Sequence, residues 1–171
     1  MNNVIFDEEM NEKLLSGITK LYKAVSCTLG PNGRNVIISK DNGKPYITND
    51  GVTIASSIEL DDEIENIAVN LIKEAAKKTN ETVGDGTTTT IVLTYELYKR
   101  GLELINKGLN PIILNKSILE YKKFIIDNLK KQKKTCKSKS KIKQVSSIAS
   151  KDKNIGFIIS ELYEKVGFDN Y

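Results

Sequence analysis

Apolar residues recur along this chain at intervals of three and four, which is the spacing of one face of a helix. The clearest example is the set Ile64, Ile67, Ala68, Leu71, Ile72, Ala75 and Ala76. Such patterns predict a series of long helices, which extend from Asp7 to about Thr28, from Ile64 to near Gly84, from Thr87 to about Lys107, from Pro111 into a lysine-rich run, and from Asp152 to Gly167.

Shorter segments interrupt the helical pattern. Residues 35–39 and 46–48 are predicted to be strands, joined by a hairpin turn at Asp41-Asn42-Gly43. A short helix is predicted from Val52 to Ile58, and a short helix or a strap from Gln144 to Ala149. We therefore expect a mainly helical bundle that carries one small β-hairpin.

The composition is that of a globular domain, or of one domain plus a piece of another, with 171 residues of which 39% are apolar and 28% charged. No stretch is long and apolar enough to span a bilayer, and the first residues resemble neither a signal peptide nor a transit peptide. Cys27 and Cys136 lack metal-ligand spacing, so we expect a reducing compartment, cytoplasmic or an organelle lumen of bacterial origin. Because histidine is absent, any chemistry must use carboxylates, hydroxyls and lysines.

Eight lysines and no acidic residue lie between residues 130 and 143. The net charge of +4 comes from this run, because acidic residues outnumber basic ones in the rest of the chain. A basic run can follow a nucleic-acid backbone, but this one lacks the arginine and aromatic side chains that contact bases. It coincides with a predicted helix end, where lysines are favoured. We therefore expect a solvated loop, with no nucleic-acid partner and no membrane partner.

The stretch Val83-Gly84-Asp85-Gly86-Thr87-Thr88-Thr89-Thr90 lies between two predicted helices. It is predicted to be a sharp turn that opens onto a helix N-terminus, where unpaired N–H groups and the helix dipole favour a phosphate. The two glycines let the backbone approach a ligand, and Asp85 offers the carboxylate oxygen that Mg²⁺ prefers. The alternative is that Asp85 or Thr87 only caps the helix. Four β-branched threonines are a poor helix start for stability alone, so we favour phosphate binding.

Two other turns have a related composition. Gly30-Pro31-Asn32-Gly33 ends the first predicted helix, because proline has no N–H and the glycines permit turn dihedrals. Asn49-Asp50-Gly51 places a carboxylate at the apex of a tight turn. On local grounds alone, Asp50 is best explained as the cap of the short helix that follows it.

These three turns carry a resemblance to a known family. Thr28-Leu29-Gly30-Pro31-Asn32-Gly33-Arg34-Asn35, Asn49-Asp50-Gly51-Val52-Thr53-Ile54-Ala55 and Gly84-Asp85-Gly86-Thr87-Thr88-Thr89 resemble segments of the group I chaperonins (the GroEL type), in the same order and at the same spacing. The resemblance covers the whole chain. It implies an incomplete helical bundle of the chaperonin equatorial-domain type, with the N-terminal part of the ATP-binding equatorial domain at 1–133 and the first part of the intermediate domain at 134–171.

The resemblance implies an ATP- and Mg²⁺-dependent protein-folding subunit of a homo-oligomeric ring. The resemblance also implies that Asp50 is more than a helix cap. On this interpretation its side chain lies near the γ-phosphate and orients the attacking water. The resemblance further implies that Asp85 binds Mg²⁺ and that Ile148 lies near the adenine or ribose of the nucleotide. Asn49 stands where many members carry lysine, and its backbone carbonyl is suited to a monovalent cation such as K⁺. The residues assigned to the phosphates are Thr28, Leu29, Gly30, Pro31, Gly86, Thr87, Thr88 and Thr89.

A full subunit of that family is several times longer than this chain. Its partners are unfolded client proteins and a co-chaperonin, and we expect the domain that binds them, as well as a further catalytic aspartate, to lie outside this sequence. Whether this chain hydrolyses ATP is therefore left open. The alternative function is that of a truncated, non-catalytic interaction protein that associates with intact chaperonin subunits.

Overall fold

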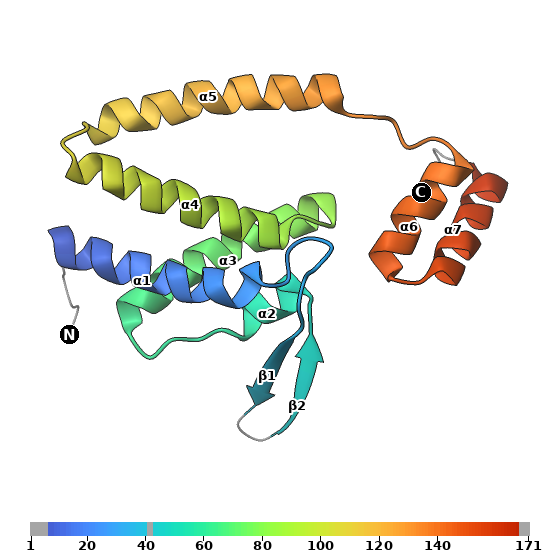
Figure 1. Cartoon of the computed structure of the whole chain (residues 1–171), viewed down its shortest axis with the longest axis horizontal. Coiled ribbons are helices and arrows are strands. Elements are labelled where there is room, and N and C mark those ends of the chain that lie inside the picture. Colours follow the sequence, from blue (N-terminus) through green and yellow to red (C-terminus); the bar gives the residue numbers. More distant parts are fainter. Residues whose placement is uncertain (1–6, 41–42, 168–171) are drawn as a thin grey trace. The chain divides into compact units, whose positions relative to one another are not determined.

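This computed structural model describes residues 7–40 and 43–167 of the chain. These residues contain seven helices and one β-hairpin (Figure 1). The chain divides into two compact units, Met1–Leu114 and Asn115–Tyr171. The expected mainly helical class is confirmed, whereas the boundary at 133/134 stays a prediction. In chain order the elements are α1 (Asp7–Ser26), β1 (Val36–Lys40), β2 (Gly43–Thr48), α2 (Gly51–Ser57), α3 (Glu63–Val83), α4 (Thr87–Asn106), α5 (Pro111–Gln132), α6 (Lys139–Ser150) and α7 (Lys153–Val166).

The predicted hairpin is present as two antiparallel strands. Val36 pairs with Thr48 and Ile38 with Tyr46. Ile38 is buried, whereas Ile37 is exposed on the other face of the sheet, as the alternation of a strand requires. Of the predicted turn Asp41-Asn42-Gly43, the first two residues lie outside the described part, and Gly43 begins β2.

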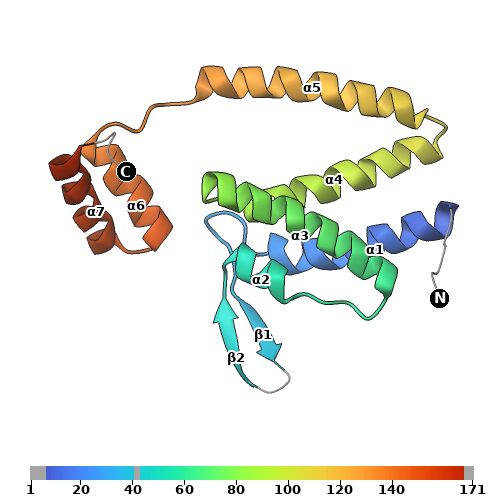
Figure 2. The same cartoon turned by 180° about the vertical axis from the view of Figure 1, so that it is seen from behind.

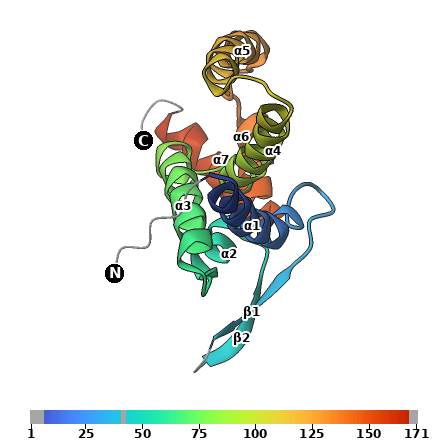
Figure 3. The same ribbon diagram turned by 90° about the vertical axis from the view of Figure 1, so that its left-hand side faces the viewer.

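The core of the first unit lies between α1, α2, α3 and α4, and Figure 3 shows the hairpin projecting away from these helices. The stacked rings of Tyr22 and Tyr95, with centroids 4.0 Å apart, join α1 to α4. The side chains that are most completely buried in this core include Leu21, Val25, Ile54, Val69 and Ile91. The stripe expected on α3 is only partly buried, because Ala68, Ile72 and Ala76 face the core whereas Ile67 and Leu71 are exposed.

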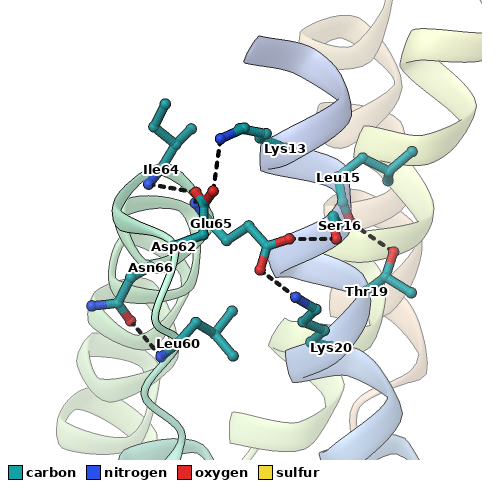
Figure 4. Close-up of polar contacts among 10 residues, drawn as sticks. All are labelled: Lys13, Leu15, Ser16, Thr19, Lys20, Leu60, Asp62, Ile64, Glu65 and Asn66. Carbon is teal, nitrogen blue, oxygen red and sulfur yellow. Dashed lines mark hydrogen bonds and ion pairs between the residues drawn. The ribbon is translucent and has the colours of Figure 1, made fainter. Parts of the chain in front are cut away.

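The helices α1 and α3 cross with their backbones in contact at Gly17. A Cβ on Gly17 would lie 2.4 Å from the carbonyl oxygen of Glu65, so only glycine permits this approach. The carboxylate of Glu65 accepts hydrogen bonds from Ser16 Oγ (2.7 Å) and from Lys20 Nζ, and Asp62 pairs with Lys13 at 2.7 Å (Figure 4). The hydrogen bond from Lys20 is the main reason that the pKa of Glu65 is lowered. Polar contacts therefore fix α1 on both sides of the crossing.

In the second unit, α6 packs closely against α7. A Cβ on Gly156 would lie 2.7 Å from the backbone nitrogen of Ser147, and Ser160 is fully buried. The alternative of a strap at Gln144–Ala149 is wrong, because these residues belong to a regular helix of 12 residues. Its start is capped by Ser138, whose hydroxyl accepts from the N–H of Lys141.

The lysine run is not one solvated loop, and this expectation needs correction. Lys139, Lys141 and Lys143 lie within α6. Lys139 forms ion pairs with Glu161 and Glu164 of α7, while Lys143 lies 5.1 Å from the centre of the Phe157 ring. Lys139 and Lys143 thus contact α7, whereas the ammonium of Lys141 donates to the carbonyl of Thr135 at 3.0 Å. Only the segment between α5 and α6 is irregular.

The Glu65 cluster yields a first prediction. Glu65→Gln should lower the free energy of unfolding at pH 7 by roughly 1 kcal/mol, because charge-assisted hydrogen bonds are weakened. The pKa of Glu65 is lowered in the folded state, so this contribution is present above the ordinary value of 4.5 and is lost as the pH falls through the folded-state pKa. Urea unfolding between pH 7 and pH 3 measures the difference. Glu63→Gln removes an exposed charge from the same helix turn and is the control. Equal effects of the two variants at pH 7 would contradict this role for Glu65.

Candidate functional site

The loop after α1 is closed by its own backbone. The N–H of Arg34 donates to the carbonyl of Cys27 at 2.7 Å, and the N–H of Gly33 donates to Gly30 at 3.0 Å. A Cβ on Gly33 would lie 2.2 Å from the carbonyl oxygen of Thr28, so the loop closes only with glycine there. Gly30 has a φ of 82°, which glycine adopts readily. The closed loop leaves Leu29, Gly30 and Pro31 exposed to a ligand.

The second turn holds Asp50 as the N-cap of α2. Its carboxylate accepts hydrogen bonds from both the N–H and the hydroxyl of Thr53, and its own N–H donates to the hydroxyl of Thr48. The cap predicted from local sequence is thus present. The carboxylate is nevertheless exposed, so capping does not remove it from contact with a ligand. The preceding Asn49 is half-buried.

The third turn connects α3 to α4 through two left-handed glycines. Gly84 ends α3 with a φ of 77°, and Gly86 precedes α4 with a φ of 94°. Asp85 between them is exposed and accepts a hydrogen bond from the N–H of Gly86 at 2.6 Å. Among the residues that the structure describes, no side-chain hydrogen bond caps α4, whereas Asp50 caps α2 and Asp62 caps α3. The first N–H groups of α4 are therefore available to an anion.

The hydroxyls of the first turn of α4 point in different directions. Thr87 is 6% exposed, and its buried hydroxyl has no hydrogen-bond partner within the described structure. It lines a cleft of about 480 Å³ whose other walls come from α2 and α3. Thr88 lies against α2, and Thr89 is exposed. The start of α4 is therefore suited to an anion, because its first N–H groups point away from the helix.

The three turns lie at one end of the first unit. Tyr22 stacks on Tyr95, and Glu8 and Asn106 line one groove, so α1 and α4 run antiparallel. The end of α1 is therefore beside the start of α4 (Figures 1 and 2). The turn at Asp50 reaches the same region, because a Cβ on Gly51 would lie 2.0 Å from the hydroxyl oxygen of Thr88. Ile148 is 77% exposed and belongs to the second unit, so its assigned role stays a prediction.

Three contributions to this geometry were not assigned from the sequence. Thr53 binds the Asp50 carboxylate, Gly33 closes the first loop, and Gly51 packs against Thr88. The spacing of Asp50 and Thr53 is that of an N-cap and the third helical residue, so that contact had a local signal. The other two depend on how the loop closes and on which helices meet.

A metal site made by protein side chains alone is not apparent. In residues 7–40 and 43–167 no three histidine, cysteine, aspartate or glutamate side chains come together in a way that could hold a metal ion. In the same residues, every helix is too short or too polar to cross a membrane.

Comparison with known proteins gives a family match. Residues 21–166 match the model of the TCP-1/cpn60 chaperonin family. The chain is similar to the chaperonin gp146 from the bacteriophage EL 2 (Pseudomonas aeruginosa), crystallised in the presence of ATP-BeFx. In one crystal form the identity is 31%, the TM-score is 0.79, and the match covers 92% of this chain and 28% of the other. In another form the identity is 30%, the TM-score is 0.80, and the shares are 94% and 29%.

A group III chaperonin in the open state has the same fold. Its identity to this chain is 22% and its TM-score is 0.79, over 92% of this chain and 32% of the other. The chain thus spans less than a third of the length of each of these solved chains.

The capping role of Asp50 can be tested by substitution. Asp50→Ala removes the cap of α2 and should lower the free energy of unfolding by about 1 kcal/mol, whereas Asp50→Asn keeps an equivalent cap and should cost less than about 0.5 kcal/mol. Equilibrium unfolding in urea measures both. If the asparagine variant is as unstable as the alanine variant, the capping geometry described for Asp50 is wrong.

Proposed function

The chain belongs to the TCP-1/cpn60 chaperonin family, and from this premise we propose that it binds Mg-ATP through its three turns, as a subunit or the N-terminal part of a subunit of an ATP-driven protein-folding chaperonin. Membership of group I in particular is part of the proposal and rests on the resemblance of the motifs. The same resemblance supports three further parts of the proposal. These are assembly into a homo-oligomeric ring, action on unfolded client proteins together with a co-chaperonin, and a location in the cytoplasm or in an organelle of bacterial origin.

The convergence of two turns is the observation that carries the proposal. Gly51 lies against Thr88, so the carboxylate of Asp50 and the start of α4 border the same space. The N-terminus of α4, whose N-cap Gly86 has no side chain, offers N–H groups to phosphate oxygens, and its Thr87 is assigned to the phosphates by the motif alone. The presence of ATP-BeFx with the similar phage chaperonin agrees with this ligand.

Within this site each turn has a distinct task. The closed loop at Thr28–Pro31 would contact the phosphates by its backbone. Asp85 would hold Mg²⁺, which is satisfied by one or two carboxylates when phosphate oxygens and waters complete its coordination. Asp50 would orient the water that attacks the γ-phosphate, and the metal would supply charge stabilisation for the transferred group. Asn49 would contribute its backbone carbonyl to a monovalent cation such as K⁺, and Ile148 would border the adenine or ribose.

Calorimetric titration of the 171-residue chain with ATP tests this proposal. Mg-ATP should bind, and Asp85→Asn should weaken binding at least about tenfold, because a metal ligand is lost. In EDTA the same substitution should have little effect, since the carboxylate then has no metal to bind.

Asp61→Asn is the matched control, because Asp61 is exposed near the opposite end of α3. If Asp85→Asn leaves the affinity for Mg-ATP unchanged, the assignment of Mg²⁺ to Asp85 is wrong. A wild-type chain that binds no nucleotide would refute the proposed site as a whole.

A second candidate function is association with intact chaperonin subunits without ATP turnover. The observation in its favour is that α5 has no buried residue, although it carries a long apolar face. Exposed apolar patches of this kind mark interaction surfaces. Its most exposed large members are Ile112, Tyr121, Phe124 and Leu129.

Co-sedimentation with a full-length chaperonin of the same family tests the second candidate. Phe124→Ser should weaken association roughly tenfold, because buried aromatic side chains dominate interfaces. Lys123→Ser changes the neighbouring exposed residue and should have little effect. Equal effects of the two variants, or steady ATP turnover by the isolated chain, would count against this function.

A further inference from the structure

Gly51 differs from Gly30, Gly84 and Gly86 in the reason why it must be glycine, and from Gly33 in that its clash is with another helix and not within its own loop. Gly30, Gly84 and Gly86 all have positive φ, and nothing crowds a Cβ on Gly30 or Gly84. Gly51 has no such dihedral, so its backbone suits any residue. It is instead buried, and a Cβ there would lie 2.0 Å from Thr88 Oγ1 and 3.3 Å from Thr88 Cβ. What excludes a larger residue is therefore the contact with α4.

The helix behind Gly51 carries the turn with it. Ile54 and Ala55 are buried in the core, and the ammonium of Lys73 binds the carbonyl of Ile58 at the far end of α2. Asp50 is joined to the same helix by its two hydrogen bonds from Thr53. A displacement of the first turn of α2 would therefore move the carboxylate of Asp50 as well.

From this geometry we infer that Gly51 is a positioning residue for the Mg-ATP site proposed above, on which this inference rests. By direct contact with Thr88, Gly51 sets the distance between the Asp50 carboxylate and the first turn of α4. Because Gly51 has no side chain, the two turns can approach each other until the backbone of Gly51 is in contact with the Thr88 side chain.

A methyl group at this position requires a neighbouring group to shift, because it would overlap Thr88 Oγ1 and lie only 3.3 Å from Thr88 Cβ. Threonine has two main χ1 rotamers in a helix, and α4 holds the Cβ close to the same point in both. Either α2 moves away together with Asp50, or the hydroxyl of Thr88 turns out of position. Both changes alter the site and leave the core residues of α3 in place.

A double-mutant cycle between Gly51 and Thr88 tests the inference. Gly51→Ala should weaken Mg-ATP binding about tenfold, measured by calorimetry at a temperature where circular dichroism shows the variant folded. Thr88→Ala removes the clashing oxygen, so adding Gly51→Ala to it should cost less than about twofold. Gly101→Ala is the matched control within α4, because its Cβ would meet only an ordinary contact, 3.6 Å from Leu114.

The outcomes separate this role from a purely structural one. If Gly51→Ala lowers the melting temperature and leaves the affinity of the folded protein unchanged, Gly51 serves stability alone and the inference is wrong. An equal affinity loss in both Thr88 backgrounds also overturns it. If Gly51→Ala does not fold, the double variant should, and failure of both to fold overturns the steric account. A wild-type chain that binds no Mg-ATP refutes the proposed site and the role of Gly51 in it together, whereas the other results refute the role alone.

Discussion

The contact between the backbones of α1 and α3 at Gly17 determines how the first unit is arranged. No side chain separates the two helices there, since a Cβ would come within 2.4 Å of the Glu65 carbonyl oxygen. Such a close crossing leaves little freedom to slide, and the flanking pairs of Lys13 with Asp62 and of Lys20 with Glu65 oppose rotation (Figure 4). The position of α1 on α3 is thereby fixed by sterics and charge together.

This crossing has a consequence for function. Because α1 is fixed on α3 and runs antiparallel to α4, the loop that follows α1 lies at the end of the unit where α3 turns into α4. The short helix α2 brings the turn of Asp50 to that end through the contact of Gly51 with Thr88. Residues separated by dozens of positions in the sequence thus border one space. The ligand proposed for this chain would bind at this end of the unit.

Local sequence predicted much of the fold but little of its long-range geometry. The apolar stripes gave the long helices, and the pattern around Asp50 gave the cap of α2. The helix α6 was only half anticipated, because its sequence is rich in lysine and serine and is stabilised by pairing of Lys139 with α7. Neither the unpaired hydroxyl of Thr87 nor the approach of Gly51 to Thr88 has a local signature, because both arise only when α2, α3 and α4 pack. The sequence could name the residues of the candidate site, but not how they meet.

The central claim is that three separate turns bind one metal–nucleotide complex, and paramagnetic broadening tests it directly. Mn²⁺ can replace Mg²⁺ in the complex with ATP, and it broadens the NMR signals of nearby amides. The account predicts that the amide signals of Gly30, Gly51 and Gly86 broaden together, while that of Gly108, beyond the far end of α4, does not. Broadening at Gly86 without Gly30 and Gly51, or equal broadening at Gly108, would contradict a shared site.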